Sequence, residues 1–395
     1  MKILMNIKKI TLLTSALILT VAAAAQTWNI GAPYQNPKVQ ATFSDGTLTI
    51  SGTGAMQSFD ADETGWRTPW AGIKNSITKI IIEEDITEIG DYAFYNCVNL
   101  TGSLPLHEGI TYIGIEAFLN CSGLTGPLTI PQSVKEIRWG AFQNCSGLSG
   151  SLTIPQGAVL TVGEGYMFAG CSGLDGSLTI PESVTSIGPY AFSGCSGLIG
   201  PLTIPSGVTA IGRYAFNRCS GLTGSLVIPQ DVKTIGDYAF NRCSGFTGAL
   251  VIPQGVTMID IYAFLDCIGL SSITIPQSLV LIEEEAFSRC SGITSVTNYA
   301  TSPQSINRNV FRGLTLNNIT LYVPASSLAF YEESPVWQEF NLKGFSTSVD
   351  EVPAGDAAVA AYYSILGVKL PQAPQSGVYI VVYDNGRAEK VVRTK

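Results

Sequence analysis

The chain carries little charge and almost no histidine. Lys, Arg, Asp and Glu make up 13% of its 395 residues, and His107 is the single histidine. A Ser–His or Cys–His mechanism would need that imidazole as its base, and nothing near it in the sequence marks such a role. His107 occupies the slot that holds proline in later repeats, so we interpret it as a solvent-facing substitution. We predict no catalytic residues, and we predict that the protein is not an enzyme.

Metal and cofactor motifs are also missing from the sequence. Zinc sites usually combine several Cys and His at paired spacing, and no C-x-x-C occurs. No G-x-x-x-x-G-K-[ST] phosphate loop is present. The segment from Asp60 to Gly65 opens like a calcium loop, but its twelfth position is Ala71 where a calcium loop needs Glu. The sequence therefore predicts neither metal-binding nor cofactor-binding residues, and no cofactor.

The N-terminus reads as a secretory leader. Lys8 and Lys9 precede the apolar run from Ile10 to Val21, and three alanines end it at Ala25. We predict a signal peptide over 1–25 and a secreted or cell-surface protein. No apolar run of 18 residues follows, which predicts no transmembrane helix in the mature chain. Losing the three leader lysines takes the formal net charge from −8 to −11, which disfavours nucleic acid as a partner.

A repeat of about 24 residues dominates the rest. The block from Ile130 to Leu148 returns in near copies that begin at Ile154, Ile180, Ile204, Ile228, Ile252 and Ile275. Nine cysteines mark its register, at 97, 121, 145, 171, 195, 219, 243, 267 and 290. Repeats of this length indicate a solenoid, because one unit cannot bury its apolar residues without a neighbour.

Each unit predicts one short strand and one short helical segment. Leu128-Thr129-Ile130 alternates inward and outward like a strand, and Pro131 ends it. Ala141 and Phe142 are expected on a helical or 3₁₀ segment, with Phe filling the interior. We count roughly eleven such strands from about residue 80 to residue 320. The cysteines share one position, where buried free thiols and partial disulfides are both compatible with stacked coils.

Two solenoid classes fit this pattern. Leu270 to Ile275 matches the L-x-x-L-x-L core of leucine-rich repeats. Right-handed parallel β-helices are the competitor, and one strand plus one Ala-Phe segment per coil favours the leucine-rich form. We predict an α/β leucine-rich-repeat solenoid, a right-handed stack of coils with a parallel sheet, an N-terminal β cap and a small C-terminal β module.

The repeat resembles the BspA-like branch of bacterial leucine-rich repeats. Its consensus, Ile-Pro-x-x-Val-x-x-Ile-Gly-x-x-Ala-Phe-x-x-Cys-x-x-Leu, is matched almost letter for letter by Ile180 to Leu198, and the likeness covers about 77–325. The resemblance implies a secreted or surface-exposed bacterial protein, often from Bacteroidetes. Several such proteins are linked to adhesion to host matrix or to other bacteria.

The ends of the chain break the period. Residues 26–76, with a hairpin expected from Val39 to Ser51, predict a cap, although a Trp-lined ligand site is an alternative. The solenoid is expected over 77–343 and a linker over 344–358. The tail, 359–395, is similar to C-terminal sorting domains of Bacteroidetes secretion, with a Gly-x-Tyr-Ile-Val element that starts at Gly377. It could instead be a relic or a simple β module.

Two surface columns are the candidate ligand-binding residues. Tyrosines share the position before Ala-Phe, and arginines share the position before Cys with Asp266 as an interruption: Tyr190, Tyr214, Tyr238, Tyr262, Arg218, Arg242 and Arg289. Both residue types are favoured at interfaces, although self-stacking that only supports the coil is the alternative. A third column on the outward side of the strands is formed by Thr129, Thr153, Thr179, Thr203 and Thr274.

We therefore predict a monomeric interaction or adhesion module that binds a protein or glycan on host matrix or other bacteria. A purely structural surface module is the second hypothesis. A glycan-active or inhibitory protein is the third.

Overall fold

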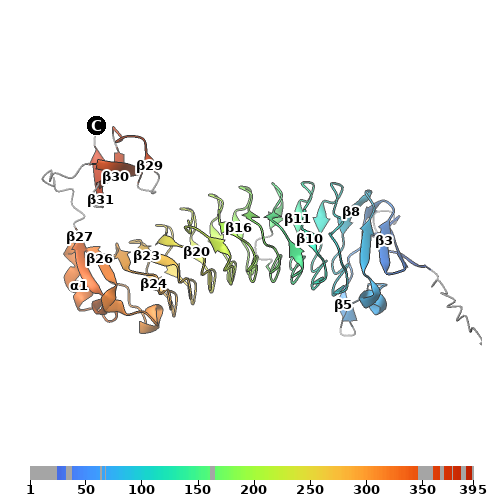
Figure 1. The fold of residues 1–395 in the computed structure, drawn as a ribbon, viewed down its shortest axis with the longest axis horizontal. Coiled ribbons are helices and arrows are strands. Elements are labelled where there is room, and N and C mark those ends of the chain that lie inside the picture. Colours follow the sequence, from blue (N-terminus) through green and yellow to red (C-terminus); the bar gives the residue numbers. More distant parts are fainter. Residues whose placement is uncertain are drawn as a thin grey trace, which may run out of the picture.

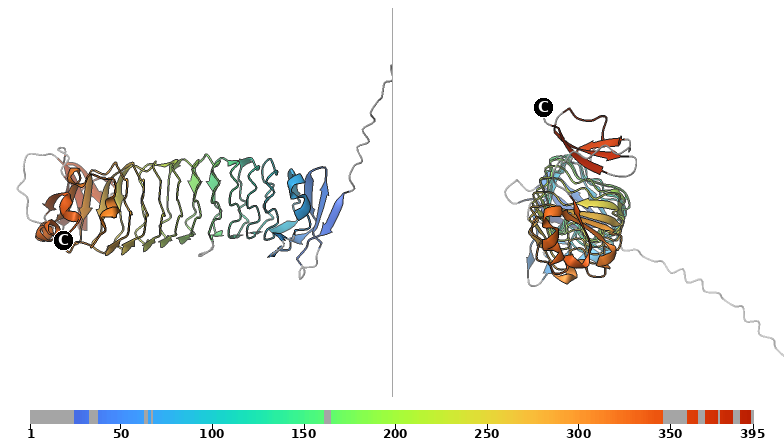
Figure 2. Two further views of the ribbon diagram at one scale, coloured as in Figure 1. Left: turned by 90° about the horizontal axis from the view of Figure 1, so that it is seen from below. Right: turned by 90° about the vertical axis from the view of Figure 1, so that its left-hand side faces the viewer.

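A computed structural model shows an elongated stack of coils that runs from an N-terminal cap to a C-terminal closing unit (Figure 1). It describes residues 25–32, 38–62, 65–66, 68–160, 165–345, 359–364, 369–375, 377–383 and 388–393. Nearly all of the predicted leader and linker lie outside these ranges. Seen end-on, the coils lie one behind another along the long axis (Figure 2). Within the described ranges no helix is long or apolar enough to cross a membrane.

A first parallel ladder runs along the side of the stack where one strand per coil was predicted. In several regular coils the paired residues precede the predicted strand: Gly126–Pro127 pair with the next coil, whereas Leu128-Thr129-Ile130 are not in a strand, so the predicted position is wrong there. Short pairs form where the coil is regular, and a longer sheet, ordered β21-β23-β25-β26-β27, closes the C-terminal end. Buried and more exposed residues alternate along the longer strands of this ladder, as the pattern predicts, although Ile81, Val251 and Tyr322 are large apolar or aromatic residues on the outward side. The strands are β7 (Lys79–Ile82), β10 (Gly126–Pro127), β12 (Leu148–Ser149), β13 (Leu152–Thr153), β15 (Leu178–Thr179), β17 (Gly200–Pro201), β19 (Leu222–Thr223), β21 (Gly248–Val251), β23 (Leu270–Ile275), β25 (Ser295–Asn298), β26 (Thr320–Pro324) and β27 (Asn341–Phe345).

A second parallel ladder runs along another side of every coil, so the expectation of a single strand per coil is wrong. It forms where the Val-x-x-Ile element buries Ile187, Ile211 and Ile235 while the preceding residues face outward. Two five-stranded sheets make up this ladder. They contain β4 (Gly54–Ala55), β8 (Ile86–Ile89), β9 (Tyr112–Ile113), β11 (Glu136–Ile137) and β14 (Val159–Leu160), then β16 (Ser186–Ile187), β18 (Ala210–Ile211), β20 (Thr234–Ile235), β22 (Met258–Ile259) and β24 (Leu281–Ile282).

The Ala-Phe segment is a turn, not the helical or 3₁₀ piece predicted from sequence. Its backbone is left-handed at two residues, for example Tyr214 (φ 56°) and Arg218 (φ 61°). This conformation lets alternate N–H groups bond to the next coil. Tyr214, Phe216 and Arg218 donate to carbonyls of the following coil at 2.7, 2.8 and 2.7 Å. These bonds between neighbouring coils use backbone N–H donors that would pair within the segment if it were a helix.

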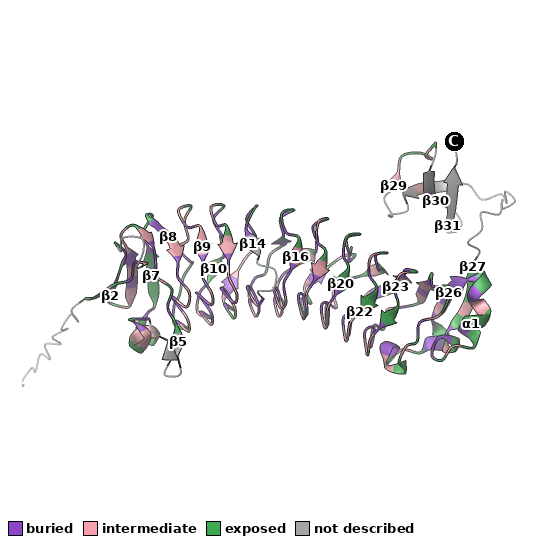
Figure 3. Ribbon diagram, turned by 180° about the vertical axis from the view of Figure 1, so that it is seen from behind, coloured by how far each residue is buried: buried purple, intermediate pink, exposed green. Residues whose placement is uncertain are grey.

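The interior is built on a column of ten phenylalanines, one per coil from Phe94 to Phe311. Adjacent rings are stacked with centroids 5.1 to 5.8 Å apart and planes within 14°. The nine cysteines lie beside this column, buried and outside any disulfide. Buried residues line the inside of the stack and exposed residues the outside (Figure 3).

A tryptophan closes each end of the phenylalanine column. Trp70 is buried, stacks on Phe94 and donates its indole N–H to Ala93 O at 2.9 Å. Trp337 is buried against Phe311 and donates to Gln304 O at 2.7 Å. Since Trp70 is covered on both sides, the alternative of a Trp-lined ligand site finds no support there.

The N-terminal cap extends the first ladder by an antiparallel hairpin. The sheet order is β1-β2-β3-β7, with β1 (Gln26–Asn29), β2 (Gln40–Ser44) and β3 (Thr47–Ser51). The hairpin turns at Asp45 and Gly46, both at positive φ, as the sequence predicts. The cap also contains η1 (Ala71–Ser76) and the two-stranded β5 (Ala61–Asp62) and β6 (Gly65–Trp66). It covers the apolar end that a bare coil would expose to water.

The C-terminal closing unit contains α1 (Leu328–Glu332), which is the α-helix of the described chain, with η2 (Arg308–Phe311), η3 (Leu316–Asn318), η4 (Ala325–Ser327) and η5 (Trp337–Glu339). Strand β27 continues through Phe345, two residues into the predicted linker. The tail forms an antiparallel module ordered β29-β28-β30-β31, from β28 (Val359–Ser364), β29 (Lys369–Leu370), β30 (Gly377–Tyr383) and β31 (Ala388–Arg393). Tyr379 and Val381 are buried in it.

Candidate ligand-binding surface

The four predicted tyrosines form one continuous stack, which a fifth residue, Tyr166, extends. From Tyr166 to Tyr262 the ring centroids are 4.2, 4.6, 4.4 and 4.6 Å apart, and the first three pairs are within 10° of parallel. All five rings are half-buried. Tyr166 was not predicted as a member because Met167 replaces the alanine of the Ala-Phe element that defines the position.

Stacking determines what this Tyr column can offer a ligand. Each ring covers the face of its neighbour, so the column presents ring edges and hydroxyl groups to solvent and few open faces. A sugar that stacks on an aromatic face would find no such face along the middle of the column. The geometry therefore favours the alternative in which the tyrosines chiefly support the coil, with their hydroxyls left for contacts.

The charges beside the Tyr column are mutually satisfied. The guanidinium of Arg213 lies 5.1 Å from the ring centroid of Tyr214 and 3.7 Å from the carboxylate of Asp237. A hydrogen bond with the Asp260 carboxyl, followed by burial, raises the pKa of Asp237. Burial, with the neighbouring tyrosines as a second cause, raises the pKa of Tyr238 to about 12. Tyr238 is therefore neutral at physiological pH.

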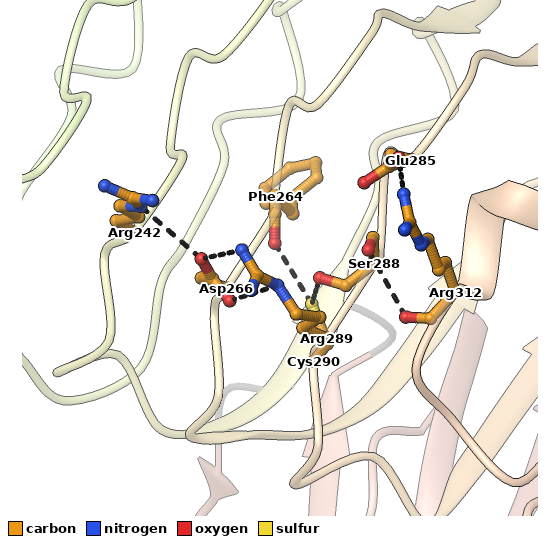
Figure 4. A network of polar contacts seen from close by, with 8 residues as sticks. All are labelled: Arg242, Phe264, Asp266, Glu285, Ser288, Arg289, Cys290 and Arg312. Carbon is orange, nitrogen blue, oxygen red and sulfur yellow. Dashed lines mark hydrogen bonds and ion pairs between the residues drawn. The ribbon is translucent and has the colours of Figure 1, made fainter.

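The predicted Arg column is exposed, and Asp266 joins two of its members. The Asp266 carboxylate lies 3.4 Å from Arg242 Nε and 3.0 Å from Arg289 Nε, and it accepts a second bond from Arg289 Nη2 at 3.0 Å (Figure 4). In the sequence Asp266 looked like an interruption. In the structure it is a bridge between coils. One coil further toward the C-terminus, Arg312 is paired with Glu285 at 2.9 Å.

A shallow groove follows the first half of this column. It has a volume of about 410 Å³ and crosses four successive coils, lined by Ser196, Arg218, Ser220, Arg242, Ser244, Asp266 and Ile268. The serines occupy the position after each Cys, which the sequence analysis did not single out. Of the seven candidate residues, the groove contains Arg218 and Arg242, whereas the four tyrosines and Arg289 lie outside it.

The predicted Thr column lies on the outward face of the first ladder. Thr129, Thr153, Thr179 and Thr203 are exposed and Thr274 is half-buried. Val227 and Val251, which replace Thr in two coils, are 66% and 49% exposed. The members of this column are uncharged.

Neither His107 nor the described part of the candidate calcium loop lines the groove. His107 is half-buried, so its interpretation as solvent-facing is wrong. Its Nδ1 accepts the Gly109 N–H at 3.1 Å, and its Nε2 is buried with no hydrogen-bond partner in the part of the chain that the structure describes. Among the described residues no group of three or more His, Cys, Asp or Glu is arranged to hold a metal ion. Part of the candidate calcium loop, residues 63–64, lies outside that range.

Comparisons with known proteins agree with this architecture. The fold is similar to a leucine-rich repeat protein from Bacteroides ovatus, with 23% identity, 73% of this chain and 76% of that chain covered, and a TM-score of 0.54. Weaker likenesses are a leucine-rich cell surface protein from Faecalibacterium prausnitzii (25% identity, 80% and 95% covered, TM-score 0.44) and the pneumococcal vaccine antigen PcpA (18% identity, 81% and 98% covered, TM-score 0.41). No curated protein matches the sequence.

The sequence itself matches the family described as the BspA type leucine-rich repeat region. Six copies are found in three overlapping matches, over 72–199, 164–260 and 209–335, which together span more than half of the chain. These residues contain the phenylalanine column and, apart from β4 and β27, the strands of the two parallel ladders. The chain belongs to the BspA-type leucine-rich repeat family.

Proposed function

We propose that this protein is a non-catalytic module, exported to the cell surface, that binds a protein or glycan on host matrix or on other bacteria. The observation that carries this proposal is the exposed Arg column on a rigid coil stack. Arg242 and Arg289 have side chains 48% and 57% exposed, at fixed spacing along one face. Arginine is enriched at binding hot spots, and a rigid scaffold reduces the entropy cost of association.

Family membership supports the location and the kind of function. Bacterial relatives of this architecture include a protein named for the cell surface. Residues 1–25 would act as the leader, and the four-stranded C-terminal module would act as a sorting signal at export. Deleting 359–395 should leave the protein inside the cell envelope; unchanged appearance at the surface would limit the proposal to the repeat region.

The binding proposal is tested with the mature chain, residues 26–395, on a panel of matrix proteins and glycans. The Tyr column and the Arg column are then changed separately, as Tyr214→Phe with Tyr238→Phe and as Arg218→Asn with Arg242→Asn. Phenylalanine keeps the ring stack and removes only the hydroxyls. Asparagine occupies the Arg column naturally at Asn96, Asn120 and Asn144, with the same left-handed backbone.

Two results decide the proposal. Binding to one panel member that the arginine or tyrosine variants weaken, with melting temperatures unchanged, would support it. The absence of binding to every member would favour the second candidate, a purely structural surface module, which the self-stacked tyrosines also fit.

A further inference from the structure

The arginines of the Arg column differ in whether their side chains are paired with a carboxylate. Arg242 and Arg289 are both held by Asp266, whereas Arg218 is exposed and makes no ion pair or side-chain hydrogen bond with any residue in the described ranges. Its neighbour toward the N-terminus in the column is Gly194, which has no side chain to cover it. The Arg218 guanidinium thus keeps all its donors open at one end of the groove.

The remaining lining of the groove is made of hydroxyls and one apolar residue. Ser196 and Ser220 are exposed and Ser244 is half-buried, one on each successive coil and therefore about 4.8 Å apart. Ile268 replaces serine in the next coil and is 48% exposed, which makes it an apolar wall at the far end. Along its length the groove offers an open guanidinium, a row of hydroxyls and an aliphatic patch.

The charge of the groove selects a ligand with isolated carboxylates. A guanidinium matches a planar carboxylate with two parallel N–H···O bonds. Two arginines against one aspartate make the groove locally positive. The chain as a whole carries −8, so a densely charged polyanion would be repelled by the rest of the surface.

The lining favours a sugar over a peptide. An extended peptide gains affinity from a free strand edge and from apolar pockets for alternate side chains, and the groove supplies neither. Hydroxyls that both donate and accept suit the hydroxyls of a sugar ring. Their spacing of one coil is also close to the length of one pyranose unit, so successive sugars could meet successive coils.

We infer that this groove binds a carboxylated sugar, a uronic or sialic acid unit of a glycan. Arg218 holds the carboxylate, Ser220 and Ser244 bond to ring hydroxyls, and Ile268 contacts the apolar face of a sugar. This inference rests on the proposed binding function and names its ligand class.

The experiment is calorimetric titration of the mature chain with four probes: trigalacturonic acid, its methyl ester, sialyllactose and hexaglutamate. Trigalacturonic acid, sialyllactose or both should bind, and the first alone or the second alone would identify the source of the carboxylate. The methyl ester, which has lost the charge, should bind at least tenfold more weakly than the acid.

Three variants test the site. Arg218→Asn should weaken binding of the acidic sugar at least tenfold without lowering the melting temperature, because Asn suits this backbone. Asp266→Asn should strengthen binding several-fold, since it releases Arg242 and removes the one carboxylate of the groove. Arg308→Gln, which changes an exposed arginine paired with Glu339 outside the groove, should leave binding unchanged.

Other outcomes overturn the inference. These are no binding of either acidic sugar, equal binding by Arg218→Asn, or hexaglutamate binding as tightly as the sugars and through Arg218. If a protein or neutral glycan from the panel binds while the acidic sugars do not, the ligand class fails and the proposed function survives.

Discussion

The thiol of Cys219 donates a hydrogen bond to the backbone carbonyl of Phe192 in the preceding coil, at 3.0 Å. The same carbonyl accepts the N–H of Cys195 at 3.1 Å. Cysteine at this position therefore fills the interior and satisfies the second lone pair of a buried carbonyl. The arrangement repeats from Cys121 to Cys290, with Sγ to carbonyl distances of 3.0 to 3.1 Å.

Buried thiols should make the protein sensitive to alkali. Burial raises the pKa of Cys219 to about 12, whereas an unfolded thiol ionises near pH 8.5. The folded state thus holds the proton more tightly. The stabilisation is complete below pH ~8.5 and falls above it by roughly 1.4 kcal/mol per pH unit for each thiol. Thermal melts between pH 7 and 10 should show a steep loss above 8.5.

A variant with two thiols removed, Cys219→Ala with Cys243→Ala, is the matched control. It should melt at a lower temperature at pH 7 but lose less stability per pH unit. Identical slopes for the variant and the parent would contradict the linkage to thiol ionisation.

Truncation of the phenylalanine column should be costly. Phe216 is fully buried between Phe192 and Phe240, with centroids 5.4 Å away on each side. Phe216→Ala should lower the free energy of unfolding by about 3–5 kcal/mol. Denaturant melts measure this change, and Phe330→Ala, at a side chain 61% exposed on α1, is the control with little expected effect. A near-neutral effect of Phe216→Ala on the free energy of unfolding would mean that the phenylalanine column contributes little to stability.

Two glycines should respond in opposite ways to alanine. A Cβ on Gly221 would lie 2.4 Å from Leu198 O and 2.8 Å from Ser196 O, both backbone atoms that cannot move aside. Gly221→Ala should destabilise by roughly 1–3 kcal/mol. Gly207→Ala meets nothing within 4 Å and should be neutral or slightly stabilising. Equal melting temperatures for the two variants would argue against the tight stacking at Gly221.

The Tyr column should tolerate loss of its hydroxyls better than loss of its rings. Tyr214→Asn relieves the left-handed backbone by about 1 kcal/mol but removes contacts with two stacked rings, each worth about 0.5–1.5 kcal/mol beyond its burial. We expect a net destabilisation of about 1–2 kcal/mol, with Tyr214→Phe close to the parent. Calorimetric melts distinguish these outcomes, and a more stable Asn variant would show that backbone strain outweighs stacking.

The periodic residues revealed the solenoid from sequence because each of them has one dominant environment. Phe216 and Cys219 recur at fixed spacing and are buried in every coil. The second ladder was missed because its strands, such as Ser186–Ile187, are two residues long and show no alternation to detect. Turn geometry was equally hidden, since Tyr and Arg seldom adopt positive φ.

The candidate surface was harder to predict than the fold. The repeat alone shows which residues share a position, so the Arg column could be predicted from sequence. Which of them is engaged depends on side-chain reach between coils, and this separates Arg218 from the pair bridged by Asp266. The serine row was overlooked because it is part of the Cys-Ser-Gly element that every regular coil shares.

The left-handed residue before each cysteine also limits how this surface can diversify. Along the chain that place holds Asn, Gly, Arg or Asp, and a β-branched residue there would strain its own coil whatever its contacts outside. Each coil thus contributes one variable surface residue, which is neutral, cationic or anionic, above the shared Phe and Cys positions of the interior. Duplication of a coil would add one such residue to the column and leave the neighbouring ones in place.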